Sequence, residues 1–175
     1  MKDYTEALKK ARIQQRVLCF LFLILAACFY YFFIVRLSAQ DHEQSTTLSM
    51  EIAEKIAKFF CSFGKEKSIG DVFSLANYFE HPIRKIAHFV EYGIFGSLLA
   101  GTYLPVMKII RRDTGGSGGM YRQNIMVVFI FAALDEFHQY FVPGRFASVW
   151  DILLDTAGCA FFLIFVYHIF DRKKT

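Results

Sequence analysis

Residues 125–145 read IMVVFIFAALDEFHQYFVPGR, and this stretch decides how the whole chain is interpreted. Its first ten residues, Ile125 to Leu134, contain no polar side chain, whereas Asp135, Glu136 and His138 follow directly. An ionised side chain near the centre of a bilayer costs about 2.5 to 3.5 kcal/mol on insertion scales. Such residues therefore face the protein interior or water, and they usually mark a functional site.

The composition is that of a small membrane protein. The chain has 175 residues, of which 55% are hydrophobic and 21 are Phe, and its mean hydropathy is +0.34. This length allows at most one compact domain. The formal net charge of +4 is modest and the basic residues are dispersed, so nucleic acid is not expected as a partner. The four cysteines lack metal-site spacing, which predicts buried free thiols.

Four apolar stretches predict an all-α membrane protein with four transmembrane helices. They cover about residues 17–35, 82–107, 123–142 and 149–170. The first is longer than a signal-peptide core, so we expect it to be retained. Pro82 is suited to the first position of the second helix, because the amide hydrogen that proline lacks would make no hydrogen bond within the helix there. The sequence from Val142 to Arg145 predicts a tight turn.

An amphipathic helix is predicted between the first and second spans, with Ser49 as its candidate cap. Its apolar positions recur at helical spacing: Ile52, Ile56, Phe59, Phe60 and Phe63. This single apolar face favours a helix lying in the membrane interface, and packing on the bundle is the alternative.

Basic residues predict the orientation. The basic arm (residues 1–16), the loop at 108–122 with its Gly115–Gly119 tract, and the tail at 171–175 hold five, four and three Lys and Arg. Four spans place these three segments on one side of the membrane domain (residues 17–170). The positive-inside rule therefore predicts that both termini of this cell-membrane protein are cytoplasmic.

Polar residues of three helices then reach the same depth on the outer side. Each helix contributes a pair of ionisable residues three or four positions apart: His88 and Glu91, Asp135 and His138, Asp151 and Asp155. Residues at these spacings share a helix face. We therefore predict one pocket open to the outside, with ordinary interfacial charges at helix ends as the alternative.

Acidic residues outnumber basic ones in this predicted pocket. The acids are Glu91, Asp135, Glu136, Asp151 and Asp155, against Lys85 and Arg145. Uncompensated carboxylates in apolar surroundings are costly, so either some are protonated or a cation completes the site. A divalent metal is one candidate, with His88, Glu91, Asp135 and His138 as ligands. The candidates for acid–base catalysis are Glu136, His138, Asp135, His88 and Glu91. Arg145 is suited to an anion such as a lipid phosphate, with a salt bridge to Asp151 or a headgroup contact as the alternative.

Three blocks of this sequence together resemble the VanZ-like family. They are RKIAHFVEY at 84–92, DEFHQYFVPGR at 135–145 and DILLDTAG at 151–158. The resemblance implies a small multi-pass bacterial membrane protein, and the founding member is associated with resistance to teicoplanin, a glycopeptide that acts on cell-wall precursors. The family signature falls on Lys85, His88, Glu91, Tyr92, Asp135, Glu136, His138, Gln139, Pro143, Gly144, Arg145, Asp151 and Gly158. Asp155 departs from it, because Asn is common there in relatives.

Three functions remain open. The first is an intramembrane enzyme acting on an envelope lipid, such as a polyprenyl-phosphate precursor or a phospholipid. Its candidate substrate-binding residues are Arg145, Lys85, Tyr92, Gln139, Asp151 and Asp155. The second is a non-catalytic protein that binds a cationic group on a lipid, a peptide or a glycopeptide antibiotic at the outer leaflet. An ion-coupled transporter is the third, although the inner half of the bundle offers no continuous polar path.

Overall fold

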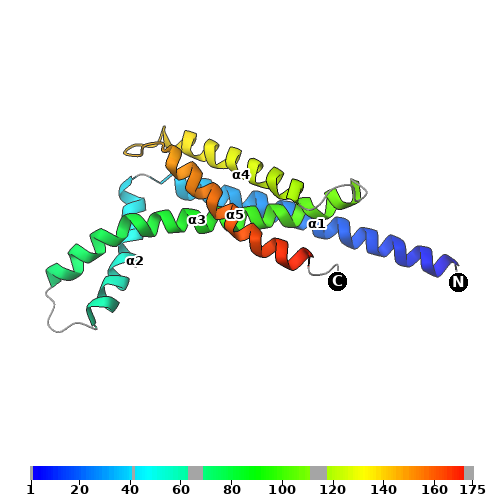
Figure 1. Cartoon of the computed structure of the whole chain (residues 1–175), viewed down its shortest axis with the longest axis horizontal. Coiled ribbons are helices and arrows are strands. Elements are labelled where there is room, and N and C mark those ends of the chain that lie inside the picture. The colour runs from blue at the N-terminus through cyan, green and yellow to red at the C-terminus, as the bar shows by residue number, and fades with distance from the viewer. Residues whose placement is uncertain (1, 41, 63–68, 111–117, 172–175) are drawn as a thin grey trace.

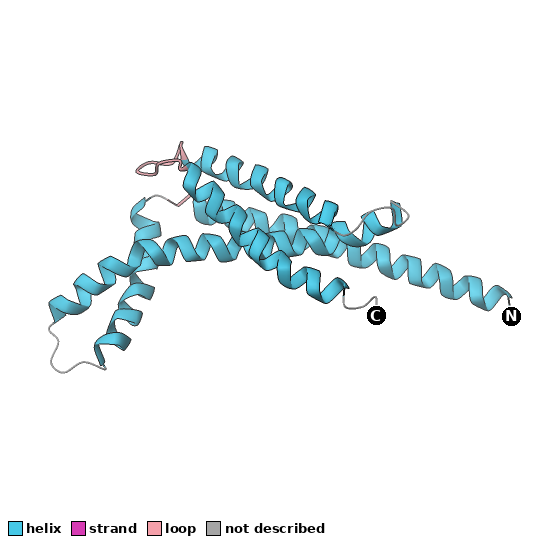
Figure 2. Ribbon diagram, in the orientation of Figure 1, coloured by secondary structure: helices cyan, strands magenta, loops and turns pink. Residues whose placement is uncertain are grey.

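The computed structural model describes residues 2–40, 42–62, 69–110 and 118–171, and within these ranges it contains helices and loops but no strand (Figure 2). The all-α prediction is therefore confirmed for the described residues. The helices are α1 (Lys2–Ser38), α2 (His42–Ser62), α3 (Ile69–Ile110), α4 (Gly118–Gln139) and α5 (Val149–Asp171). Helix α1 already begins at Lys2, so it includes most of the predicted basic arm. Most of the predicted glycine tract and of the basic tail lies outside the described residues.

Helix α3 is the centre of the molecule, because each of the other helices packs against it (Figure 1). Its 42 residues correspond to about 63 Å at about 1.5 Å per residue, roughly twice the hydrocarbon thickness of a bilayer. One part of α3 therefore extends beyond any single membrane span.

Pro82 lies inside α3, so the prediction that it starts this helix is wrong. A proline in a helix removes one backbone hydrogen bond. Contacts with α2 hold α3 on both sides of this position. Ser49 Oγ donates a hydrogen bond of 2.7 Å to Glu80 Oε1, and Ile83 packs against the alanines that join the two helices. Tertiary contacts thus offset the local loss.

Helices α2 and α3 form a hairpin that projects from the bundle (Figure 1). The two helices meet through fully buried alanines, namely Ala53, Ala57 and Ala76. Ser49 lies within α2 and is not its cap. Several large apolar side chains of the hairpin are nevertheless exposed, namely Ile52, Phe59, Phe60, Phe73 and Tyr78.

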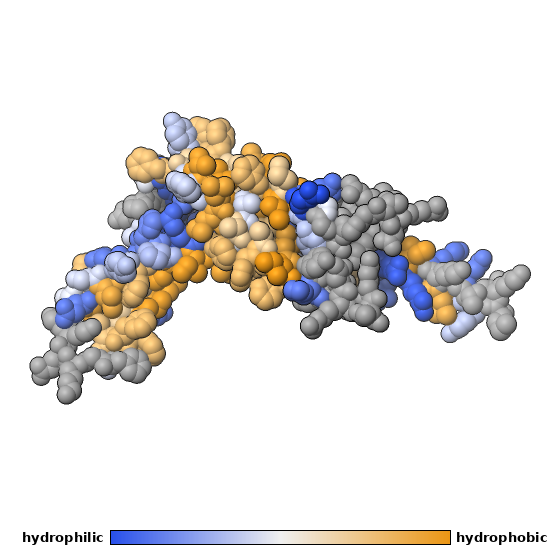
Figure 3. Space-filling model, viewed as in Figure 1, coloured by the Kyte–Doolittle hydropathy of each residue, from blue (hydrophilic) through white to orange (hydrophobic). Residues whose placement is uncertain are grey.

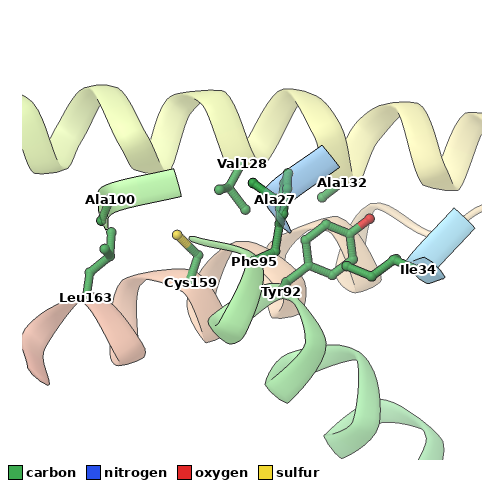
Figure 4. Packing of buried hydrophobic residues seen from close by; sticks show 9 residues of the cluster. All are labelled: Ala27, Ile34, Tyr92, Phe95, Ala100, Val128, Ala132, Cys159 and Leu163. Atoms are coloured by element: carbon green, nitrogen blue, oxygen red, sulfur yellow. The ribbon is translucent and has the colours of Figure 1, made fainter. Parts of the chain in front are cut away.

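The core of the bundle is made by side chains from α1, α3, α4 and α5 (Figure 4). Three aromatic rings, one from each of α1, α3 and α4, pack against one another in this core. Tyr31 lies 5.3 Å from Phe95 and 4.6 Å from Phe131, measured between ring centroids, and the last two rings are 5.4 Å apart. This contact fixes α1 and α4 against the central helix.

Helices α3 and α5 approach closely because glycines replace side chains where they cross. A Cβ atom built at Gly158 would lie 2.1 Å from the backbone oxygen of Phe89. A Cβ at Gly96 would lie 2.4 Å from Cys159 Sγ. Small residues at crossing points are the usual means by which membrane helices pack closely.

The surface of the bundle is strongly apolar. Two helices within the described ranges are long and apolar enough to cross a membrane, Glu6–Ser38 and Val149–Val166, and only 11% and 22% of their apolar windows are buried. Apolar residues cover the middle of the bundle in Figure 3. Such an extensive apolar surface is untypical of soluble monomers. Cys19 and Cys28 lie exposed on α1, so their predicted burial is wrong, whereas Cys159 is buried.

Candidate functional site

A polar cavity of about 410 Å³ lies where α3, the α4–α5 loop and the beginning of α5 meet. Figure 3 shows hydrophilic residues gathered in this region, between the hairpin and the bundle. Residues from all three predicted clusters contribute to its walls. The cavity, called the polar cavity below, is lined by His81, Arg84, Lys85, His88, Glu136, Gln139, Gly144, Arg145, Phe146, Asp151, Leu154 and Asp155.

An ion pair connects α3 with α5 across the polar cavity. Lys85 Nζ contacts Asp151 Oδ1, and the two side chains are 36% and 33% exposed. Because exposed ion pairs contribute about 1 kcal/mol or less, this pair positions the two helices more than it stabilises them.

The loop between α4 and α5 is built around the predicted tight turn. The Arg145 amide donates to the Val142 carbonyl at 3.2 Å, and Gly144 has a φ of 75°. Pro143 at the second position and a positive φ at the third are typical of a type II turn. The turn brings Arg145 back to the wall of the polar cavity, while the neighbouring Phe146 is 90% exposed.

Glu136 fastens this loop to α4. Its Oε2 accepts a hydrogen bond of 2.8 Å from the Ser148 amide, directly before α5 begins. The carboxylate is 3% exposed and lines the polar cavity. Helical spacing puts Glu136 on the helix face next to that of Asp135. In the structure both residues are buried.

Asp135 lies behind the polar cavity and joins α4 to α1. Ser38 Oγ donates to its Oδ2 at 2.8 Å, and Gln139 Nε2 donates to the same oxygen at 3.0 Å. Tyr92 Oη and Asp135 Oδ1 are buried, and neither makes a hydrogen bond of ordinary geometry to the part of the chain that the structure describes. Ser38 had no predicted role, because it lies beyond the first predicted span, which ended at about residue 35.

Replacing Ser38 by Ala should lower the free energy of unfolding by about 1–3 kcal/mol, because one donor to a buried carboxylate is lost. Ser74→Ala is the matched control, since Ser74 is exposed and its hydroxyl bonds only within its own helix, to Gly70. Thermal unfolding in detergent measures both variants. Equal midpoints would contradict the assigned role of Ser38.

Asp155 forms part of the innermost wall of the polar cavity. The residue is 1% exposed, and its Oδ1 has no hydrogen-bond partner within the described ranges of the chain. Glu91, Asp135, Glu136 and Asp151 all lie within electrostatic range of this carboxylate. The predicted acidic cluster thus exists around Asp155.

A smaller cavity of about 90 Å³ lies between α2 and the bundle. It shares Arg84, His88 and Arg145 with the polar cavity, so these residues separate the two spaces. Glu91 lines the smaller cavity only, and its Oε2 lies 4.0 Å from His88 Nδ1.

Some predicted site residues lie elsewhere. His138 is exposed and lines neither cavity, so it does not share the inward direction of Asp135. The four predicted metal ligands are therefore not gathered. Within the ranges that the structure describes, no three His, Cys, Asp or Glu side chains are arranged to hold a metal ion.

Other residues of the polar cavity had no predicted role, namely His81, Phe146 and Leu154. His81 lies on the part of α3 before Pro82, which was expected to lie outside the helix. It precedes Arg84, Lys85 and His88 at helical spacing. A prediction with an uninterrupted helix through Pro82 would therefore have placed His81 on the same face as these residues.

A family model described as VanZ/LLP1 matches residues 20–171 of the chain. The matched range includes every residue that lines the two cavities. Neither the curated proteins nor the solved structures contain a match.

Proposed function

The chain belongs to the VanZ/LLP1 family, and we propose that its polar cavity binds the headgroup of an envelope lipid or lipid-linked cell-wall precursor. The binding site faces the outer leaflet of a bacterial cell membrane. Family membership and two hydrophobic helices indicate a membrane protein. The ligand, the topology and the role in glycopeptide resistance belong to the proposal.

The proposed topology has four spans. Helices α1, α4, α5 and the C-terminal part of α3 cross the membrane, with both termini in the cytoplasm according to the positive-inside rule. The hairpin consists of α2 and the part of α3 that extends beyond a single membrane span. In this topology it lies in the outer interface. Its exposed aromatic residues, including Phe59, Phe60 and Tyr78, support this position.

One observation carries the proposed ligand: cationic and apolar side chains lie next to each other at the polar cavity. Arg84, Lys85 and Arg145 line it, and Phe146 beside Arg145 is 90% exposed. Guanidinium groups are well suited to phosphate. A molecule with a charged headgroup and an apolar chain would contact both kinds of side chain. The volume of about 410 Å³ lies within the range of about 300–1,000 Å³ of small-molecule sites.

This ligand also connects the site with glycopeptide resistance. Glycopeptides act on cell-wall precursors outside the membrane, so a protein that binds envelope lipids at the outer leaflet can change how these precursors are presented. Such a role requires binding alone and no catalytic step.

An enzymatic role is the second candidate, favoured by the position of His88 and Glu91. The imidazole forms part of the wall between both cavities and lies 4.0 Å from a carboxylate oxygen. A histidine next to a carboxylate is a common arrangement for general base catalysis. An ion-coupled transporter has less support, because the inner core consists of residues such as Ala27, Val128 and Leu163.

Arg145→Ala tests the proposed lipid binding. Loss of a charge-assisted hydrogen bond, worth about 1.5–3 kcal/mol, should weaken binding of a short-chain phosphatidic acid by about 10- to 100-fold. Isothermal titration of the purified protein in detergent measures this change. Arg122→Ala is the matched control, because Arg122 is exposed on α4 and lines neither cavity. Unchanged affinity in Arg145→Ala would refute the proposed site.

A further inference from the structure

The polar cavity is lined by equal numbers of basic and acidic residues. The basic residues are Arg84, Lys85 and Arg145, and the acidic residues are Glu136, Asp151 and Asp155. Asp151 is paired with Lys85, but a site selected only for an anion would not also place the buried carboxylates of Glu136 and Asp155 beside the ligand, because like charges repel strongly where little water screens them. A site selected only for a cation would not include two arginines and a lysine.

Two of the three acids lie deeper than the basic residues. Glu136 and Asp155 are 3% and 1% exposed, whereas Arg84 and Arg145 are partly exposed, and the paired side chains of Lys85 and Asp151 are 36% and 33% exposed. Glu136 and Asp155 therefore line the inner part of the cavity, and the Lys85–Asp151 pair and the two arginines lie closer to its mouth. A ligand that enters the cavity meets the arginines and the ion pair first, and the buried carboxylates of Glu136 and Asp155 last.

Asp155 provides an independent observation. Its Oδ1 is buried and receives no hydrogen bond from the residues that the structure describes, although Asp155 lines the cavity. Leaving a buried carboxylate oxygen unsatisfied costs free energy, and the cost is higher for charged groups than for neutral ones. A ligand with an N–H donor at its end would satisfy this atom.

We propose that the headgroup bound here is zwitterionic, with a terminal primary ammonium group at Asp155 and a phosphate at Arg145. The chemical class is that of phosphoethanolamine lipids. This inference rests on the proposed function, since it specifies which envelope lipid the same cavity takes.

The order of the charges in such a lipid matches their order in the cavity. Its ammonium group is terminal, and the phosphate lies between that group and the acyl chains. When the ammonium group reaches Asp155, the phosphate remains near Arg145 and the chains leave beside Phe146. A lipid that ends in a phosphate would place its negative charge against Glu136 and Asp155. A quaternary ammonium group has no N–H to donate to Asp155 Oδ1.

Three short-chain lipids with identical acyl chains test the inference: dihexanoyl phosphatidylethanolamine, phosphatidic acid and phosphatidylcholine. Isothermal titration of the purified full-length protein in detergent gives the three dissociation constants. We expect the ethanolamine lipid to bind at least 10-fold more tightly than the other two. Asp155→Asn should reduce this preference to about 2-fold while keeping the shape of the site. Glu51→Gln, an exposed carboxylate on α2, is the matched control and should keep the preference.

The wild-type ranking decides the question even if Asp155→Asn fails to fold. If phosphatidic acid binds as tightly as the ethanolamine lipid and Arg145→Ala abolishes both, the zwitterionic headgroup is refuted and the proposed phosphate-lipid site stands. Equal binding of the choline and ethanolamine lipids refutes the role of Asp155 as an N–H acceptor. Absence of binding by all three lipids refutes both proposals.

Discussion

Gly158→Ala is expected to destabilise the protein by about 3 kcal/mol and to remove most of it from the membrane fraction. The added Cβ would lie 2.1 Å from the Phe89 carbonyl oxygen on the neighbouring helix. The obstacle is backbone and not the end of a flexible side chain, so α3 and α5 must move apart. Adding atoms to a closely packed core typically costs about 1–3 kcal/mol, and a backbone contact belongs to the upper end. Thermal unfolding in detergent and membrane abundance measure the effect.

Gly101→Ala is the matched control, because it makes the same chemical change in a helix with space around it. The nearest atom to a Cβ at Gly101 is Leu23 Cδ1 at 3.7 Å, an ordinary contact. Alanine favours a helix over glycine by about 1 kcal/mol, so this variant should be neutral or slightly stabilised. Similar melting temperatures for the two variants would contradict the close crossing of α3 and α5.

Glu136→Ala is expected to abolish lipid binding and to destabilise the protein by about 2 kcal/mol. The substitution leaves the Ser148 amide without its acceptor at 2.8 Å, and hydrogen bonds to charged groups contribute about 1.5–3 kcal/mol. The loop that carries Arg145 to the polar cavity would lose its attachment to α4. Isothermal titration with dihexanoyl phosphatidylethanolamine and thermal unfolding separate the two effects.

Two further variants show which property of Glu136 matters. Glu136→Gln keeps an oxygen for the Ser148 amide and so the attachment of the loop, and stability should recover. It also removes a negative charge from the wall that faces the proposed ammonium group, so binding should stay at least 10-fold weaker. His138→Ala should leave binding unchanged, because His138 is exposed and lines neither cavity. If His138→Ala abolished binding and Glu136→Ala did not, the position of the site would be wrong.

The sequence revealed the positions of most charged residues because their helical spacing has direct physical meaning. Asp151 and Asp155 lie four residues apart on α5, and both line the polar cavity as this spacing predicts. The same reasoning failed for Asp135 and His138, which are three residues apart but differ in burial. Ser38 on α1 and Gln139 both donate to Asp135, so its surroundings depend on tertiary contacts that spacing alone does not contain.

The beginning of α3 is the clearest example of a local rule that tertiary structure overrides. Pro82 is a strong signal for the first turn of a helix, and for this reason the helix was predicted to begin there. The helix continues toward Ile69 because α2 packs against it through alanines and through the Ser49–Glu80 hydrogen bond. The Ser49–Glu80 bond joins residues 31 positions apart, and the alanines also come from two different helices, so no short window of sequence contains these contacts.

Helix α3 runs without interruption from the hairpin into the bundle, so a movement of the hairpin would be transmitted to the bundle. Arg84 is held by Glu80 at 3.6 Å, and Glu80 accepts a hydrogen bond from Ser49 on α2. Tilting the hairpin, for example when the bilayer thins or lateral pressure changes, would therefore pull this guanidinium group along the rim where it borders both cavities. Occupancy of the site would then respond to the physical state of the surrounding lipid.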